Sequence, residues 1–587
     1  MQSTRKTARN LAMLAGMSAA MTAVMSAQAE MPDVMDFVPS DTPIVVTIPN
    51  LKETHTRAIA WAEQLDQPEL QQSLLFGNVL MANPGLNAEG SAAILFTEMF
   101  DPESGEEPPV VILLPIVDFA QMVTGLAGEV GEGVTEIATP FGATIFAKPA
   151  GENFAVVGID GELVEAFAAD DGHMNSQATL LGSTGEAVVG DSHMMVIANV
   201  EQLRPALEEG LASLMEGMEM MAMFAGGAPG GMEQMEASME FIETIATGFV
   251  TDGNVGLIGL ELGDDGLALD IAAQFREGSE VAGFFQDGGE PNKLMSKLPA
   301  GDFLFAGAAD IESPGLRQLF TNYMEMAGDA AMGGMAGIDI GAAFDDANGF
   351  SFMMGSTPAL LTAGLFSNTI SYAAVDDVDE YMDSIKTAFE EMDGVTVSGL
   401  KNSVSYDAAA TEVDGVSLDA WSMEMSVDQN DPNAPMAQMA LSQMAMVFGG
   451  QAGPSGYYAK ANDGIYQTMS RNKQLIGNAM SGEDTLGESD AIQAVASQLP
   501  ANRSIEAYVG VQGIMDTLGG MVAMFGGPAL PAPEEDLLPV GLATVTDQGG
   551  VRQRIFVPTE VIETAIEIAQ DLEEMDAGGG GGFAPRF

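Results

Sequence analysis

The sequence has 587 residues and a formal net charge of −65 at pH 7, with 85 acidic residues against 20 basic ones. This charge argues against binding to nucleic acid or to anionic membrane surfaces, because both would repel the chain. The absence of cysteine excludes disulfides, thiolate metal sites and cysteine catalysis. Hydrophobic residues make up 47% of the chain, so we expect sizeable cores beneath a solvated acidic surface rather than disorder.

Residues 1–29 predict a secretory signal peptide. Arg5, Lys6 and Arg9 form a positive start, residues 11–25 are apolar, and Ala27-Gln28-Ala29 is a small-residue cleavage site. A membrane anchor is the alternative, but the apolar stretch is shorter than the roughly 20 residues that a span needs. We therefore expect export by the general secretory route, cleavage after Ala29, a location in the periplasm or outside the cell, and no later transmembrane segment.

Five segments of the first half of the chain recur in the same order in the second half. The first pair reads as a strand followed by a helix, and the second as an apolar strand that breaks at Val-Asp before a helix. The third reads as two strands and a short helix, the fourth as a strand and a helix ending at a glycine–proline stop, and the fifth as a hairpin. The pairs are 37–65 with 297–326, 110–126 with 370–389, 143–167 with 456–480, 193–231 with 504–533, and 254–275 with 540–558.

These repeats predict an α+β fold made of two homologous halves, each with antiparallel hairpins covered by helices on one face. We place the first α+β unit at 30–290, its internal duplicate at 291–576, and a flexible glycine-rich tail at 577–587. The alternative is that both halves share one continuous sheet. In the second pair, Asp118 and either Asp376 or Asp377 are expected to be helix N-caps.

The residues before the first strand, Val38-Pro39-Ser40-Asp41-Thr42, fit an opening of the form LP-x-D-[ST]. With this opening and the repeated units, the chain resembles large families of uncharacterised exported bacterial proteins, known as domains of unknown function. Two further versions, at 298–302 and 499–503, depart from the pattern after the hydrophobic–proline pair. The resemblance implies export and an α+β fold, and it supplies no catalytic residues.

Methionine is abundant, with 42 residues in the chain, and one cluster raises the possibility of a soft-metal site. Thioethers at such spacings could bind Cu(I). A flexible core filler or a greasy binding surface is the interpretation we favour, because the duplicate segment lacks the cluster and no cysteine assists. The cluster comprises Met215, Met218, Met220, Met221 and Met223.

The usual catalytic and metal-binding templates fail. The three histidines, His55, His173 and His193, follow no metal-binding spacing. Ser470-Arg471-Asn472-Lys473 has the Ser-x-x-Lys pattern of some acyl-transfer enzymes, but the accompanying motifs are missing. The acidic run 376–380 could bind calcium, although it lacks an EF-hand pattern and a helix N-terminus explains it more simply.

We therefore assign no catalytic, cofactor-binding or metal-ligating residue. The prediction is an exported, soluble, non-enzymatic protein that binds an apolar small molecule, such as a lipid, or an envelope protein partner. The Met- and Gly-rich stretches 226–239 and 328–344 could be lids over an apolar cavity or simple connections. Two alternatives stay open: a surface assembly protein bridged by divalent cations, and an enzyme built from scattered carboxylates.

Overall fold

The computed structural model describes eleven stretches of the chain: residues 31–65, 67–99, 108–138, 144–168, 170–225, 246–286, 288–321, 347–357, 363–397, 399–524 and 536–578. The predicted signal peptide and its cleavage site lie outside the described residues. Both possible lid stretches, 226–239 and 328–344, also lie outside them. The chain divides into two compact units. Unit 1 comprises Met1–Ile59 and Gln72–Asn199, and unit 2 comprises Ala60–Gln71 and Val200–Phe587.

Unit 1 is an antiparallel sheet with helices attached, in the strand order β7-β1-β2-β3-β6-β5-β4. Helices α2 (Leu51–Gln64) and α3 (Pro68–Met81) contribute residues to both units. The other elements of unit 1 are η1 (Asp33–Phe37), β1 (Ile44–Ile48), β2 (Ala92–Phe96), β3 (Val110–Pro115), α4 (Phe119–Gly125), β4 (Thr135–Ala138), β5 (Thr144–Ala150), β6 (Phe154–Gly158), α5 (Gly161–Ala166), α6 (Met174–Asp191) and β7 (Met194–Asn199).

Unit 2 is a longer antiparallel sheet, in the strand order β8-β9-β20-β19-β18-β10-β11-β12-β17-β16-β15-β14-β13. Its elements up to β14 are α7 (Val200–Ala225), β8 (Gly253–Leu262), β9 (Gly266–Phe275), α9 (Glu280–Phe284), α10 (Asn292–Met295), β10 (Phe303–Asp310), β11 (Ala347–Gly355), β12 (Thr369–Val375), α14 (Val378–Met392), β13 (Thr396–Val397) and β14 (Leu400–Val413). They are followed by β15 (Val416–Val427), α15 (Ala434–Val447), β16 (Ser455–Lys460), β17 (Gly464–Thr468), α16 (Lys473–Ser481), η2 (Leu486–Glu488), α17 (Asp490–Ala496), β18 (Ile505–Val509), α18 (Val511–Met524), β19 (Val540–Asp547), β20 (Gly550–Pro558) and α19 (Thr559–Gly578).

The α+β class is confirmed, and the described residues of the five segment pairs form the predicted strands, helices and hairpins, whereas the glycine–proline stops of the fourth pair lie outside the described residues. For example, the Val-Asp breaks lie between β3 and α4 and between β12 and α14. The Asp118 carboxylate accepts the backbone N–H of Gln121 at 2.7 Å, and Asp377, not Asp376, caps α14. Helix α19 extends to Gly578, two residues into the predicted tail, and 579–587 lie outside the described residues.

The strand orders of the two units can be compared directly. In unit 1 the sheet runs β7-β1-β2-β3-β6-β5-β4, and in unit 2 the run β18-β10-β11-β12-β17-β16-β15 has the same strand order, except that β13 and β14 intervene along the chain between β12 and β15. The units divide between residues 199 and 200, whereas the sequence repeat divides the chain near 290.

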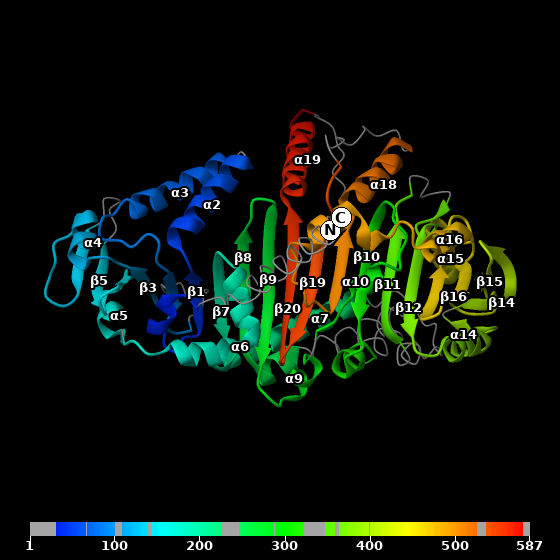
Figure 1. Ribbon diagram of the computed structural model, residues 1–587, viewed down its shortest axis with the longest axis horizontal. Helices are drawn as coiled ribbons and strands as arrows, with labels where there is room; N and C mark the ends of the chain where they lie inside the picture. Colours follow the sequence, from blue (N-terminus) through cyan, green and yellow to red (C-terminus); the bar gives the residue numbers. More distant parts are fainter. Residues whose placement is uncertain are drawn as a thin grey trace, which may run out of the picture. The chain divides into compact units, whose positions relative to one another are not determined.

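The pairing of β9 with β20 joins the two sequence halves inside unit 2. These antiparallel strands pair from Gly266↔Pro558 to Gln274↔Gly550. Figure 1 shows β8 and β9, drawn in green shades, beside β20 and β19, drawn in orange and red. Strands from the two sequence halves therefore lie side by side in one continuous sheet at this junction.

The main core of unit 2 lies on one face of this sheet. Met295 of α10, Ile476 of α16 and Val495 of α17 belong to one buried cluster with strand residues such as Tyr372 and Tyr508. Burial of these large apolar side chains is the main stabilising contribution to the unit. We call this side of the sheet the buried face.

Helices also pack on the opposite side of the sheet, so the expected single helix-covered face is not confirmed. At the β14–β17 end, Met382 and Phe389 of α14 form a second cluster with Trp421, Tyr458 and Ile465. The rings of Phe389 and Trp421 stack with centroids 5.7 Å apart. Because successive residues along a strand point to opposite faces, Ile465 lies on the other side of the sheet from Tyr466 of the main core, and this cluster is therefore opposite that core.

Candidate functional site

The candidate site is the side of the unit 2 sheet opposite the buried face. It covers the part of the sheet from β8 to β11, which in sheet order is β8-β9-β20-β19-β18-β10-β11. The register places one row across all of these strands: Leu260, Leu269, Ile555, Leu542, Ala507, Gly307 and Phe352 are successive partners. Directly paired residues of antiparallel strands point to the same side of the sheet. We call the surface formed by this row and its neighbours the open face; it comprises Ile258, Leu260, Leu269, Ile271, Phe305, Phe352, Met354, Ile505, Ala507, Val509, Leu542, Thr544, Gln553 and Ile555.

The open face is apolar and exposed to solvent. Ile258 is 48% exposed, its cross-strand partner Ile271 is 45%, Phe305 is 44% and Phe352 is 38%. The remaining members are half-buried, and none of the fourteen carries a charge. A soluble antiparallel sheet normally presents polar residues on the side that is not packed, so this surface departs from the usual pattern.

The buried face of the same strands holds the charges instead. The Asp270 carboxylate, fully buried, accepts hydrogen bonds from Arg552 Nε at 2.7 Å and Arg554 Nη1 at 3.2 Å. Arg554 also pairs with Glu261. Asp270 and Arg554 are direct partners across β9 and β20. Ion pairs thus occupy the covered side of the sheet, while the exposed side is uncharged.

A second buried ion pair lies on the same side, on β18. Glu506 accepts from Arg503 Nε at 2.7 Å and from the Tyr508 hydroxyl at 3.0 Å. The Arg503 side chain also donates to the carbonyl of Pro500 at 2.8 Å. Burial and the neighbouring Glu506 carboxylate raise the pKa of Tyr508 above its ordinary value, which keeps this phenol protonated as a donor.

Among the described residues, helical segments border the open face on two sides. At the end of β9, Phe275 packs with Phe285 and Phe249, and Ala282 of α9 belongs to the same cluster. At the other side, Phe320 contacts Phe350 of β11 with ring centroids 5.4 Å apart. The exposed residues listed above lie between these two borders.

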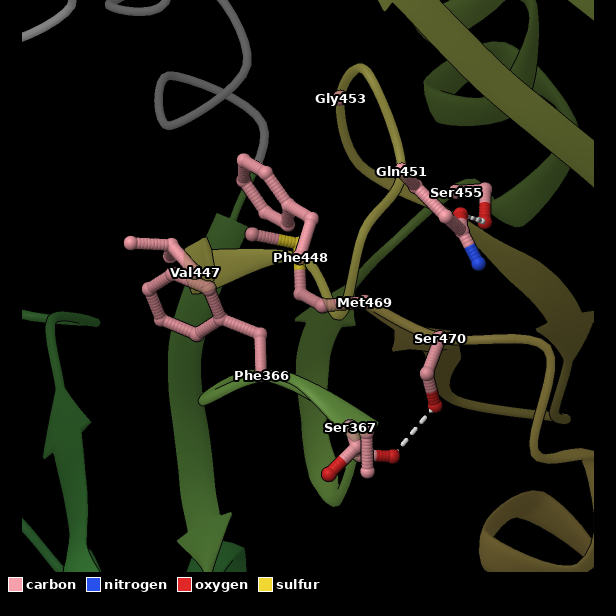
Figure 2. Close-up of a pocket in the computed structure, with 10 residues that line it drawn as sticks. Phe366, Ser367, Val447, Phe448, Gln451, Gly453, Ser455, Met469 and Ser470 are labelled. Carbon is pink, nitrogen blue, oxygen red and sulfur yellow. Dashed lines mark hydrogen bonds between the residues drawn. The ribbon is translucent and has the colours of Figure 1, made fainter. Parts of the chain in front are cut away.

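A small pocket lies elsewhere in unit 2, and Figure 2 shows its lining. Phe366, Val447, Phe448 and Met469 supply its apolar side, and Ser367, Gln451, Ser455 and Ser470 its polar side. The cavity volume is about 30 Å³, enough for roughly two water molecules. A lipid or other drug-sized ligand needs roughly 300 Å³ or more, so this pocket does not fit the predicted apolar small molecule.

The pattern Ser470-x-x-Lys473 does not form a pair in the structure. The Ser470 hydroxyl donates to the carbonyl of Ser367 at 2.5 Å (Figure 2), and the Lys473 ammonium donates to the carbonyl of Glu412 at 2.9 Å. Each group is thus bound to a different backbone carbonyl: Ser470 to that of Ser367, in the turn before β12, and Lys473, at the start of α16, to that of Glu412 in β14.

The histidines are held by separate local contacts in unit 1. His55 Nε2 lies 3.1 Å from the carbonyl of Leu74, His173 precedes α6, and His193 Nε2 lies 3.7 Å from Glu53. Within the described residues, no group of three or more His, Asp or Glu side chains is arranged to hold a metal ion.

The acidic run 376–380 is engaged in structural contacts. Asp376 accepts from Asn348 Nδ2 at 2.8 Å, and Asp377 accepts two backbone N–H groups at 3.0 Å. Asp379 pairs with Lys460, and this contact lowers the pKa of Asp379.

Of the methionine cluster, Met215 is half-buried on α7, and the side chains of Met218, Met220, Met221 and Met223 lie outside the described residues.

Displaced pKa values in the described residues all move away from neutrality. Burial raises the pKa of Tyr466 to about 12, and it raises the pKa of Tyr458 further. Asp463 is partly buried, which alone would raise its pKa, but hydrogen bonds from Lys297 and Tyr372 lower it. General acids and bases need pKa values near the working pH, so these groups serve the fold.

Sequence reasoning missed the open face, although a signal for it was present. The segment 254–262 and the segment 266–275 are apolar at nearly every position, where a sheet with one solvated side would alternate. The isolated charge in the second segment, Asp270, marks the buried side rather than the exposed one. The hydrophobic pattern alone could not reveal that the charged residue is buried and the apolar residues are exposed.

No protein-family model, no curated protein and no solved structure matches the chain. Among the described helices, none combines the length and the apolarity needed to cross a membrane.

Proposed function

We propose that this chain is an exported, non-enzymatic binding protein and that the open face of unit 2 holds its apolar partner. One observation carries the proposal: the strands β8 to β11 keep their charges on the covered side and expose only uncharged side chains. Leaving Ile258, Ile271, Phe305 and Phe352 in water forgoes the free energy that their burial would supply. An exposed apolar patch of this kind is typical of an interaction surface.

The shape of the surface favours a macromolecular partner over a small molecule. From β8 to β11 the face spans six strand spacings, or about 29 Å. Small-molecule sites enclose most of their ligand in a concavity, whereas this face lies along one side of a sheet. Of the two predicted partners, an envelope protein therefore fits better than a free lipid.

The absence of enzymatic activity is part of the proposal. The contacts of Ser470 and Lys473 with separate carbonyls, and the displacement of pKa values away from neutrality, support it. The pKa shifts favour the protonated phenol of Tyr466 and the ionised carboxylate of Asp463 in the native state.

Export and internal duplication are proposed on separate grounds. The sequence of residues 1–29 supports export to the periplasm or beyond. The shared strand order of β7-β1-β2-β3-β6-β5-β4 and β18-β10-β11-β12-β17-β16-β15 supports an ancestral unit that was duplicated, as in the resembled families with the LP-x-D-[ST] opening.

Binding of the neutral apolar dye Nile red tests the open face as a site. We expect the dye to bind with enhanced, blue-shifted fluorescence, and Phe305→Thr combined with Ile271→Thr to weaken it. Complete covering of the exposed 44% of a phenylalanine, about 90 Å², contributes up to about 2 kcal/mol, or roughly thirtyfold in affinity.

Met439→Gln is the matched control, because Met439 is 61% exposed on α15, outside the open face. Its dye affinity should equal that of the unchanged protein. If the control weakens binding as much as the double variant does, the dye reports general surface hydrophobicity and the open face is not the site.

A further inference from the structure

The open face has a markedly acidic border at one end of its strands. Asp264 and Asp265 form the turn between β8 and β9, Asp302 precedes β10, and Asp536 precedes β19, and all four are exposed. The register brings these positions to the same end, because Val540, Val509 and Phe305 are successive partners, and Val557 pairs with Leu267. We call these four aspartates the acidic border.

No basic residue occurs in the segments that make this end. The sequences 262–266, 299–302, 510–516, 536–540 and 558–563 contain no Lys or Arg. At the opposite end of the strands, by contrast, Arg276 pairs with Asp252 at 3.3 Å. The uncharged open face is therefore bordered by acidic residues without nearby basic ones at this end of its strands.

The negative charge of the chain limits which molecules can bind the open face. A second copy of this chain would bring another net charge of −65, and an anionic lipid surface would also be negative, so both are repelled at low salt. A partner with positive charge beside an apolar surface is attracted by the border and buries the open face.

Backbone pairing limits how such a partner can bind. Strand β9 pairs with both β8 and β20, and β18 pairs with both β10 and β19. These strands have no free edge for an added strand, so a partner contacts the open face through side chains. An amphipathic helix does this by laying its apolar side on the surface.

We propose that the open face binds an amphipathic helix of another exported polypeptide, with lysine or arginine along the border of its apolar stripe. This inference rests on the proposed function and adds the partner's fold and charge. An 18-residue helix is about 27 Å long, which matches the width of about 29 Å from β8 to β11.

Three synthetic 18-residue helices with the same leucine and alanine stripe provide the probes. The positions bordering the stripe are lysine in the first, glutamine in the second and glutamate in the third. Affinity for the full exported chain is measured by fluorescence anisotropy at 20 mM and 500 mM NaCl. We expect the lysine peptide to bind about tenfold more tightly than the glutamine peptide at low salt, with the difference shrinking below threefold at high salt. The glutamate peptide should bind most weakly.

Two variants test the acidic border and the apolar open face independently of each other. The combined change Asp265→Asn and Asp302→Asn removes two of the four border charges, so it should reduce the preference for the lysine peptide from about tenfold to about threefold and leave the affinity of the glutamine peptide unchanged. Phe305→Thr should weaken all peptides that bind. The combined change Glu390→Gln and Glu391→Gln is the charge-matched control, because it removes two exposed charges from α14 at the β14–β17 end of the sheet; it should change neither affinity.

Equal affinity of the lysine and glutamine peptides at low salt would overturn the charge inference and leave the proposed function standing. Lysine-peptide binding that is insensitive to Phe305→Thr would also overturn it, because it would reflect general attraction to an acidic protein. Binding of neutral phosphatidylcholine vesicles, but of no peptide, would replace the helix by a lipid surface. Failure of both Nile red and every peptide would remove the proposed function as well.

Discussion

Replacement of Asp270 by asparagine tests whether the buried ion pairs hold the two sequence halves together. Asp270 lies on β9 and its partners Arg552 and Arg554 lie on β20, 282 and 284 residues away in sequence. The change keeps the shape of the side chain and removes its charge. Arg552 and Arg554, each only 5% exposed, then lose this buried counterion.

The expected cost follows from the partners that remain. Removing one member of a buried ion pair typically costs about 3–5 kcal/mol. Arg554 retains Glu261, so we take the lower end, about 3 kcal/mol. If unit 2 unfolds as one cooperative body of roughly 400 residues, this lowers its Tm by about 4 °C. Differential scanning calorimetry measures the shift, and hydrogen exchange in β9 and β20 shows whether the loss is local.

Asp379→Asn is the matched control, because it removes the same charge from an exposed pair with Lys460. Such surface pairs contribute little to stability, so the Tm should change by less than about 1 °C. A Tm for Asp270→Asn within 1 °C of the unchanged protein, with β9 and β20 still protected from exchange, would refute the stabilising role of this cluster.

Three further outcomes are expected. Raising NaCl from 20 to 500 mM should raise the Tm, since salt screens the repulsion within a chain of net charge −65; a Tm that falls would contradict this. Asp377→Ala should cost about 1 kcal/mol in urea unfolding through loss of the α14 N-cap, whereas Asp376→Ala should cost less because that side chain caps no helix; equal costs would contradict the assignment. Burial raises the pKa of Tyr466 to about 12, above the unfolded value near 10, so this contribution to stability is complete below pH 10 and is lost as pH rises from 10 towards 12. Absorbance at 295 nm should therefore show buried tyrosines ionising together with loss of the circular dichroism signal, and full ionisation near pH 10 with the fold intact would contradict it.

Local structure was predictable because its determinants are close together in sequence. The Val-Asp breaks placed the caps of α4 and α14, since an N-cap carboxylate needs only the backbone N–H groups two or three residues ahead. The hairpins β8–β9 and β19–β20 followed from short turns between apolar runs. In the second hairpin, Gln548 and Gly549 take positive φ values of 46° and 79° at the turn.

The candidate site was not predictable in the same way. Ile258, Ile271, Phe305 and Phe352 are apolar residues in apolar strands, and sequence patterns assign such residues to a core. The structure instead buries Asp270 and Arg554 and exposes the isoleucine pair. Which side of a strand is covered depends on where helices pack, and α10, α16 and α17 come from separate parts of the chain to cover the same side of the sheet.

The sequence by itself determined the acidic character of the chain, the order of its strands and helices, and the N-caps of α4 and α14, because charge, periodicity and capping act over a few residues. The tertiary structure alone decided that β9 pairs with β20, that the charges lie on the covered side, and that one apolar face stays exposed. These features depend on pairing across more than 280 residues, and the period-two alternation of a strand is the same whichever side meets the solvent.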